Sequence, residues 1–336
     1  MRRMVVTGGA GFIGSHVVDR LAEEGHEVVV IDDFSVGREE NLRQHAHSRN
    51  VFVERADVRD LRAMSRLLRG ADTVFHLAVQ CLRVSLYDPL FVHEVNATGT
   101  LTTCMAAREA NVGRFVYVSS SEVYGSAISA PMKEGHPLRP TTPYAASKLA
   151  GEMYALSFAK THGLPVIIVR PFNAYGPREH HEGSSGEVIP RFVIRALCDV
   201  RPTIFGDGEQ TRDFTWVSDT ALGIVRAAEC DELLGRPINI ACGEEVSIKR
   251  VAEIILRTVG RVGLGIAQAP ARPGDVRRHF ADIQLARGLL HFSPSVSIEE
   301  GISRYVDWLR QNAPDPRALL AEQEPVNWLP ELAATG

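Results

Sequence analysis

The sequence is short of cysteine, has no long apolar run and carries no marked excess of either charge. Its five cysteines include no CxxC pair, and an odd number spread this widely is not a disulfide framework. We therefore expect a reduced, cytoplasmic protein with no structural zinc or other bound metal. The N-terminal residues MRRMVVTGG lack the apolar core of a signal peptide, and no apolar run approaches the length that spans a membrane.

The charge balance excludes two classes of partner. A formal net charge of −4 over 336 residues offers no basic surface to nucleic acid or to an anionic membrane. Arg272, Arg277 and Arg278 form a small basic cluster, which suits a small phosphorylated ligand better than a polymer. A chain of this length can bury a large core in two lobes.

Short apolar runs alternate with amphipathic segments through the first half of the chain. The runs predict strands at residues 3–7, 27–31, 51–54, 73–77, 115–118 and 166–170. The segments between them predict helices at residues 12–24, 61–68, 92–110 and 144–161. This alternation is typical of an α/β protein with a doubly wound parallel sheet, the Rossmann fold.

The composition changes after Pro171, where Gly, Pro and charged residues become frequent. Helices are expected at residues 190–198, 218–230 and 247–259. We therefore divide the chain into a Rossmann domain at residues 1–170 and a smaller C-terminal α/β lobe at residues 171–336. Some of the second half is expected to cross back to the first domain, and the Pro- and Ala-rich tail after Asn312 is expected to be partly mobile.

Glycines three apart lie between the first expected strand and helix, in VVTGGAGFIG. Gly8 would permit a tight turn, Gly11 a close approach of the backbone to a pyrophosphate, and Gly14 close packing of the helix on the sheet. Asp32 ends the second strand about twenty residues later, where an acid would accept hydrogen bonds from an adenosine ribose and repel a 2′-phosphate. The pattern predicts NAD rather than NADP. The other residues expected around the cofactor are Phe12, Ile13, Asp57, Val58, Leu77, Ala78 and Pro171.

Tyr144 and Lys148 stand four residues apart at the start of an expected helix, which places them on one face. A nearby ammonium lowers the pKa of a phenol toward neutrality, as a phenol acting as general base requires. Together with the Ser-rich end of the preceding strand, the pair is interpreted as a base and the cation that tunes it.

As a set, TGGAGFIG, the SSS before VYG, and YAASK resemble the extended short-chain dehydrogenase/reductase superfamily, and within it the nucleotide-sugar epimerases and dehydratases. The likeness continues through NATGT, RPFNAYGPR, VIPRF and FGDGEQTRDFTWVSD. The resemblance implies an NAD-dependent enzyme that forms a transient 4-ketone on a nucleotide-diphosphate sugar, with UDP as the default nucleotide. Some members only bind NAD, but they generally lose the tyrosine or the lysine, and both are present here.

The resemblance also implies roles for single residues. Tyr144 would take the proton of the C4 hydroxyl, Ser120 would hydrogen-bond that hydroxyl, and Lys148 would hold the nicotinamide ribose. The residues implied to bind the nucleotide-sugar are Asn173, Val188, Arg191, Phe205, Arg212, Arg272 and Asp275, with Arg212 and Arg272 on the pyrophosphate. Dimers in the family join two helices from each subunit, so we expect a homodimer through residues 92–110 and 144–161.

Glu122, in VSSSEVYG, leaves the reaction open. A 4-epimerase needs no second base, and there Glu122 would cap or pair locally. In the dehydratases that the chain resembles, a glutamate at this position removes the C5 proton, and Ser121 would stand where a neighbour helps to expel the C6 hydroxyl. UDP-glucuronate decarboxylases share this residue order. Because PTTPYAASK, RPFNAYGPR and VIPRF are closer to epimerases, we expect 4-epimerisation first, 4,6- or 5,6-dehydration second and decarboxylation third.

The segment at residues 178–187 borders the expected sugar pocket. Its paired histidines, His180 and His181, are expected to face solvent rather than to hold a metal.

Overall fold

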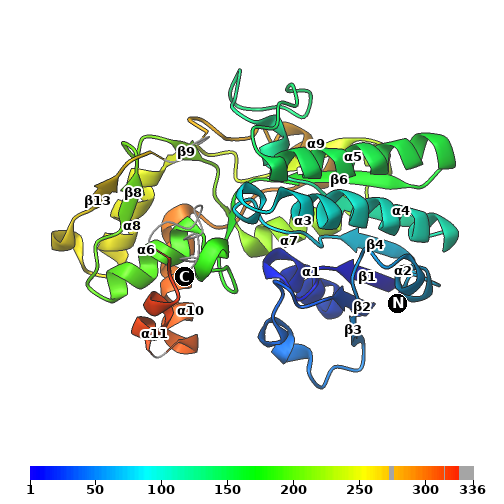
Figure 1. Cartoon of the computed structure of the whole chain (residues 1–336), viewed down its shortest axis with the longest axis horizontal. Coiled ribbons are helices and arrows are strands. Elements are labelled where there is room, and N and C mark those ends of the chain that lie inside the picture. Colours follow the sequence, from blue (N-terminus) through cyan, green and yellow to red (C-terminus); the bar gives the residue numbers. More distant parts are fainter. Residues whose placement is uncertain (272–275, 314, 325–336) are drawn as a thin grey trace, which may run out of the picture.

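A computed structural model of the chain describes residues 1–271, 276–313 and 315–324 (Figure 1). Its centre is a seven-stranded parallel sheet of order β11-β6-β5-β4-β1-β2-β3. The strands are β1 (Arg3–Thr7), β2 (Glu27–Asp32), β3 (Val51–Arg55), β4 (Thr73–His76), β5 (Arg114–Val118), β6 (Val166–Pro171) and β11 (Pro237–Ile240). Each of the six strands predicted from the sequence is present, with its ends shifted by no more than one residue.

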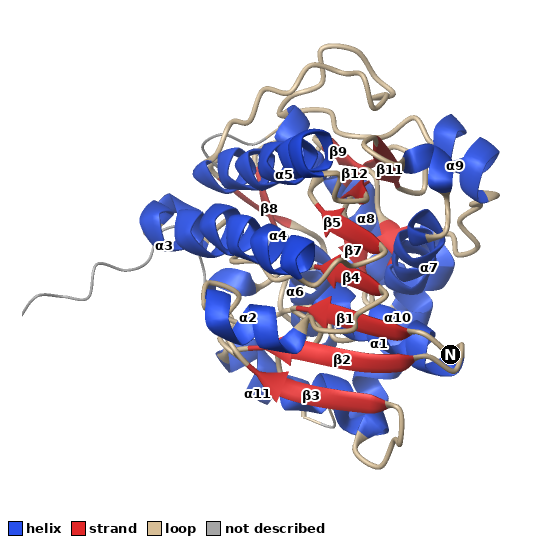
Figure 2. Cartoon of the chain, turned by 90° about the vertical axis from the view of Figure 1, so that its right-hand side faces the viewer, coloured by secondary structure: helices blue, strands red, loops and turns tan. Residues whose placement is uncertain are grey.

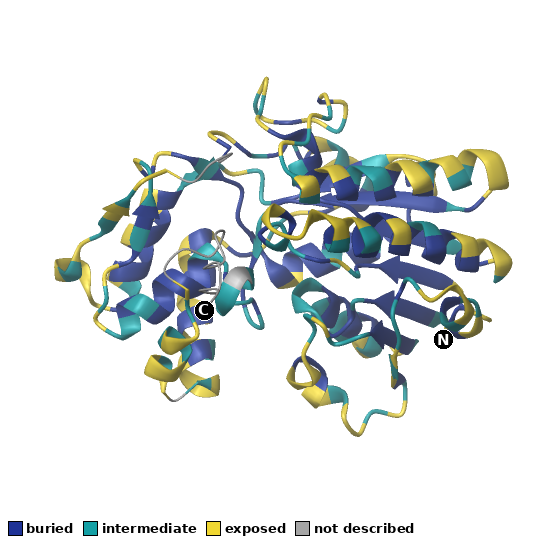
Figure 3. Ribbon diagram, viewed as in Figure 1, coloured by how far each residue is buried: buried dark blue, intermediate teal, exposed yellow. Residues whose placement is uncertain are grey.

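Helices cover both faces of the sheet, as Figure 2 shows. One face is covered by α2 (Leu61–Leu67), α4 (Gly99–Glu109) and α5 (Pro143–His162), whose apolar side chains share a core with β4 and β5. The other is covered by α1 (Phe12–Glu23), α7 (Val217–Ala228) and α9 (Gln284–Leu290). Burial on both faces explains the continuous apolar runs of the central strands (Figure 3). The Rossmann prediction is confirmed.

One predicted helix has a different form. Residues 92–110 belong to α3 (Pro89–His93), a π-helical turn (Glu94–Thr98) and α4. In the π-turn, the amide of Asn96 accepts a hydrogen bond from the backbone of Gln80 at 2.8 Å and donates to its carbonyl at 3.2 Å. Such turns are frequent at functional sites, and this one lies beside the cleft described below, where Gln80 and Val95 are lining residues.

The second half of the chain forms a smaller lobe and also returns to the sheet. The lobe contains α6 (Val188–Leu197), α8 (Ile248–Thr258), α10 (Ile298–Asn312) and α11 (Pro316–Ala321), which share one apolar core. Three short strand pairs complete it: β7 (Ala174–Tyr175) with β10 (Thr215–Trp216), β8 (Thr203–Phe205) with β13 (Ala267–Ala269), and β9 (Thr211–Arg212) with β12 (Val246–Ser247). Since α7, β11 and α9 belong to the sheet layers, the domain division at residue 170 remains a proposal.

The described part of the tail after Asn312 contains α11, which packs against α6. Among the described residues, no helix is long and apolar enough to cross a membrane. No three His, Cys, Asp or Glu side chains of the described ranges are grouped in a way that could hold a metal ion.

Candidate active site

A cleft lies at the carboxyl ends of the parallel strands and extends to the smaller lobe. In this sheet β2 lies on one side of β1 and β4 on the other, and ligands of such sheets bind where the order reverses. The cleft brings together most of the predicted site residues: Gly8, Gly11, Phe12, Ile13, Gly14, Asp32, Asp57, Val58, Leu77, Ala78, Ser120, Ser121, Glu122, Tyr144, Lys148, Pro171, Asn173 and Arg212.

The glycine-rich turn makes close backbone contacts that a side chain would prevent. Gly8 has a φ of +67°, and a Cβ there would lie 2.7 Å from the backbone nitrogen of Ala78. A Cβ on Gly14 would overlap the carbonyl oxygen of Gly8. The first residue of α1 follows Gly11, which contributes no side-chain cap, so the N–H groups of the first turn are available to an anion.

Asp32 is held in one orientation at the end of β2. Its Oδ2 accepts a hydrogen bond from the backbone of Ala10, and its Oδ1 accepts one from Phe34, both at 2.9 Å. Burial raises the pKa of Asp32, and these two hydrogen bonds oppose the rise. A fixed carboxylate and a free helix N-terminus on one cleft fit the ribose and pyrophosphate of a dinucleotide.

Ser120 and Tyr144 meet at the end of β5. The Ser120 side chain accepts a hydrogen bond from the Glu122 backbone at 3.2 Å, which begins a short turn at Ser121–Tyr124. Burial raises the pKa of the Tyr144 phenol, and a hydrogen bond with Ser120 lowers it.

Lys148 differs from the expectation that it tunes the phenol. Its Nζ donates to the carbonyl of Val118 at 2.8 Å and lies 4.5 Å from the ring centre of Tyr117. Burial lowers the pKa of Lys148 to about 7, and the charge of Glu152 opposes this. In this structure, therefore, Ser120 rather than Lys148 counteracts the effect of burial on Tyr144.

Glu122 lines the cleft beside these residues. Its negative charge contributes to the raised pKa of Tyr144. Within the ranges that the structure describes, its carboxylate takes part in no ion pair and no side-chain hydrogen bond. The local pairing considered for an epimerase is therefore not seen, and the carboxylate faces the space that a substrate would fill.

Comparison with known proteins agrees with this geometry. Residues 4–241 match a family model described as the NAD dependent epimerase/dehydratase family. The chain belongs to this family. A UDP-glucose 4-epimerase of Mycolicibacterium smegmatis is 38% identical over 314 residues, which cover 93% of this chain and 99% of the relative.

Two solved structures have the same fold over almost their whole length. The UDP-glucose 4-epimerase of Thermotoga maritima with UDP-glucose has a TM-score of 0.87 at 33% identity, covering 92% of this chain and 99% of that one. A dTDP-glucose 4,6-dehydratase of Streptomyces venezuelae with NAD has a TM-score of 0.88 at 33% identity, covering 93% and 98%. The protein is thus an NAD-dependent enzyme of the nucleotide-sugar epimerase/dehydratase family, and these predictions are confirmed.

Two residues of the enzyme's nucleotide end have informative surroundings. The Oδ1 of Asn173 is buried and finds no hydrogen-bond partner among the described residues, so a ligand donor could satisfy it. Arg212 donates through Nη1 to the carbonyls of Thr211 at 2.8 Å and Val276 at 2.7 Å, which holds its guanidinium at the cleft.

Other predicted substrate residues lie elsewhere. Val188 and Arg191 are on α6, and Phe205 ends β8; none of the three lines the cleft. Arg191 donates to the carbonyl of Glu324 at 2.6 Å, and burial lowers its pKa to about 10. Their roles remain predictions, because a ligand can reach past the lining residues. Arg272 and Asp275 lie outside the described residues.

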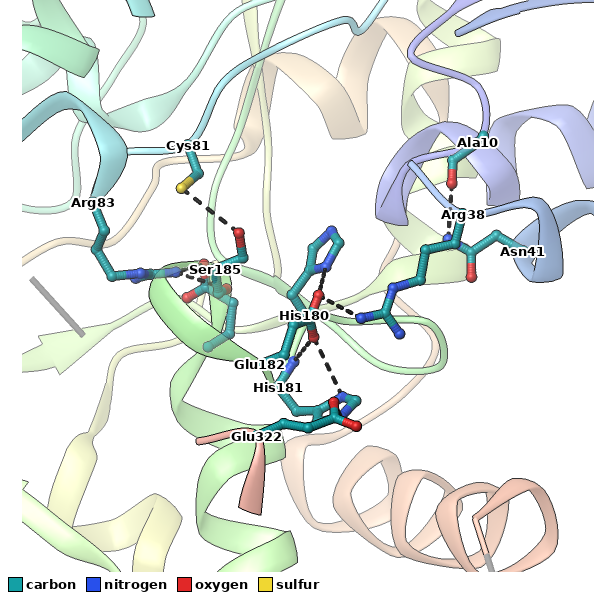
Figure 4. A network of polar contacts seen from close by, with 11 residues as sticks. Ala10, Arg38, Asn41, Cys81, Arg83, His180, His181, Glu182, Ser185 and Glu322 are labelled. Carbon is teal, nitrogen blue, oxygen red and sulfur yellow. Dashed lines mark hydrogen bonds and ion pairs between the residues drawn. The ribbon is translucent and has the colours of Figure 1, made fainter. Parts of the chain in front are cut away.

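The segment at residues 178–187, which we call the strap, is fixed by polar contacts on three sides (Figure 4). Glu182 Oε1 lies 2.7 Å from His180 Nδ1 and 2.7 Å from Arg38 Nη2. His181 Nε2 lies 3.1 Å from a carboxylate oxygen of Glu322. The expectation that the paired histidines face solvent is wrong: their side chains are only 14% and 12% exposed, because each is turned to a glutamate.

Sequence reasoning missed three contributors to the enzyme's site. Arg83 and Glu187 line its sugar end and form an ion pair. His279 is fully buried, donates through Nε2 to the carbonyl of Ser121 at 3.1 Å, and lies tilted against the ring of Phe172 at 5.1 Å. No pattern marks these residues, since each reaches the site from a different segment.

Glu152, by contrast, had a signal. It follows Tyr144 and Lys148 at the same four-residue spacing on α5. It accepts hydrogen bonds from Ser119 Oγ at 2.9 Å and Arg170 Nε at 3.1 Å. The buried carboxylate thereby ties the Ser-rich turn to the helix that carries the base.

Proposed function

We propose that the enzyme interconverts a UDP-sugar and its C4 epimer through a transient 4-ketone. The observation that carries the proposal is the meeting of Ser120, Tyr144 and Lys148 beside a dinucleotide site, in one cleft. The same chemistry is named for the relatives of Mycolicibacterium smegmatis and Thermotoga maritima, both UDP-glucose 4-epimerases.

Each residue has a task that its position supports. Ser120 orients the C4 hydroxyl and hydrogen-bonds the Tyr144 phenol, so that Tyr144 can take the hydroxyl proton and later return it. NAD, when bound, accepts the hydride of C4 and gives it back. Lys148 supplies a buried cation one helical turn from the phenol. Arg212 offers a fixed cation for the diphosphate, and Asn173 a buried acceptor for the nucleotide-sugar.

A direct test is to incubate the purified enzyme with NAD and a panel of UDP-sugars, and to analyse the products by mass spectrometry and NMR. Epimerisation leaves the mass unchanged and inverts C4. Loss of water would show dehydration, and loss of carbon dioxide would show decarboxylation; either product without C4 inversion would overturn the proposal.

Dehydration is the second candidate, and the exposed carboxylate of Glu122 in the cleft favours it. Once C4 is a ketone, the C5 proton is acidic, and Glu122 could remove it. A dehydratase would then bring solvent deuterium into C5, and Glu122→Gln would stop that exchange while the 4-ketone and NADH accumulate. In a 4-epimerase no deuterium enters carbon and the variant costs little.

We also propose a homodimer through α3, α4 and α5. These helices carry large apolar side chains with high exposure: Leu90 at 66%, Met105 at 43% and Met153 at 45% (Figure 3). The mass by light scattering at micromolar concentration should be that of two chains, and Met153→Glu should lower it. A monomer mass for the unaltered protein would contradict this.

The five cysteines are all free in the structure, and two of them are buried. This supports the proposal that the enzyme works in a reducing cytoplasm, which fractionation of the source cells with an antibody would test.

A further inference from the structure

Two carboxylates lie close to the base at the sugar end of the cleft. Glu122 comes from the turn after β5, and Glu187 comes from the end of the strap; both line the cleft. Both charges also contribute to the raised pKa of the Tyr144 phenol. The two carboxylates therefore face the region where the reacting sugar would lie under the proposed function.

The buried cation of this region is already matched by a carboxylate. Arg83 is 7% exposed, and its Nη2 lies 2.5 Å from Glu187 Oε1 and 2.9 Å from the carbonyl of Ser185. A short contact between charged groups of this kind is strong and directional. To bind an anionic sugar through Arg83, the enzyme would first have to break this ion pair.

The other charged groups near the cleft are directed elsewhere. Lys148 donates to the carbonyl of Val118, and Arg212 to the carbonyls of Thr211 and Val276. His180 is paired with Glu182. Glu122 has no Arg or Lys partner among the described residues, so its charge at the sugar end is not offset by an ion pair.

From this charge arrangement we infer that the substrate carries a neutral sugar, a hexose whose C5 substituent is not a carboxylate. A second anion placed beside Glu122 and Glu187 would be repelled and would lose hydration without gaining a free cation. The inference rests on the proposed function and narrows its substrate class. It separates this enzyme from those that act on a nucleotide-linked uronic acid.

Binding to the inactive Tyr144→Phe holoenzyme tests the inference without turnover. Dissociation constants would be measured by calorimetry for UDP, UDP-glucose, UDP-N-acetylglucosamine and UDP-glucuronate at neutral pH. We expect UDP-glucuronate to bind more weakly than UDP-glucose by about tenfold or more. Equal or tighter binding of UDP-glucuronate would overturn the inference alone. Failure of UDP and of every UDP-sugar to bind would instead overturn the proposed function.

Two variants in the same background locate the selectivity. Glu187→Gln frees Arg83 and should reduce the preference for UDP-glucose over UDP-glucuronate. Glu300→Gln makes the same charge change on α10, where the side chain is 49% exposed and paired with Arg304, and should leave the ratio unchanged. Equal ratios in the two variants would overturn the assignment. If Glu187→Gln does not fold, as judged by its melting curve, Glu122→Gln removes the other carboxylate and must reduce the preference instead.

Discussion

The two ends of the cleft are built in different ways. At the cofactor end, the glycine turn and Asp32 directly follow β1 and β2, so each is positioned by the strand before it. At the sugar end, Arg83, Glu122 and Glu187 come from three segments that meet only in the folded chain. The comparison teaches that a local pattern is enough to place a cofactor, whereas substrate choice depends on long-range contacts.

The largest effect should come from a change that affects chemistry and spares the cofactor end. Tyr144→Phe removes only the phenol oxygen, so we expect turnover to fall by roughly 10²–10⁴-fold while the Kd for NAD stays unchanged. Tyr154→Phe is the matched control, since it lies on the same helix with 36% exposure and away from the cleft. Near-full activity of the Tyr144 variant in a product assay would refute the assignment of the base.

The same contrast explains what the sequence could and could not predict. Strands buried on both faces are visible as apolar runs, so the sheet followed from the sequence. The π-turn at Glu94–Thr98 did not, because it depends on the contact between Asn96 and the backbone of Gln80. His279 was missed for a similar reason: its contact with Ser121 links residues 158 positions apart.

The next largest effect should come from crowding the cofactor turn. A Cβ on Gly14 would overlap the carbonyl of Gly8, and neither backbone can move without distorting the turn. We expect Gly14→Ala to lower the free energy of unfolding by about 1–3 kcal/mol and to abolish NAD binding. Gly288→Ala is the control, because nothing lies within 4 Å of a Cβ at that helical position. Urea unfolding and NAD titration would measure both, and a Gly14 variant that behaves like the control would contradict the close packing.

Cofactor choice tests whether a single local residue decides the cofactor end. The carboxylate of Asp32 is fixed by Ala10 and Phe34, so a 2′-phosphate would be held beside a negative charge. We expect NAD to bind more tightly than NADP by about tenfold or more, and Asp32→Asn to reduce the difference. Asp33→Asn changes the neighbouring acid, whose carboxylate accepts from Ser35, and should leave it nearly intact. Equal affinity of the unaltered enzyme for both cofactors would show that Asp32 does not discriminate.

The smallest effect concerns the join between the two ends. Asp19, on α1, accepts hydrogen bonds from Arg178 at the start of the strap at 2.6 Å and from Gln44. Burial acts to raise the pKa of Asp19, but His45, Arg178 and Gln44 together hold it lower, at about 2, against an ordinary value of 3.8. Because the folded pKa is the lower one, this stabilisation is present above pH 3.8 and is lost as the pH falls toward 2. Its size is about 1 kcal/mol once partial solvent exposure is allowed for.

Asp19→Asn should therefore lower the free energy of unfolding near neutral pH and make it less dependent on pH between 4 and 2 than in the unaltered enzyme. Asp307→Asn is the control, since Asp307 is 62% exposed on α10 and its nearest cation, Arg310, is 3.8 Å away. Urea unfolding at a series of acid pH values would compare the three proteins. If Asp19→Asn follows the same pH curve as the unaltered chain, the contact with Arg178 does not fasten the strap, and the two ends of the cleft are joined only through the backbone.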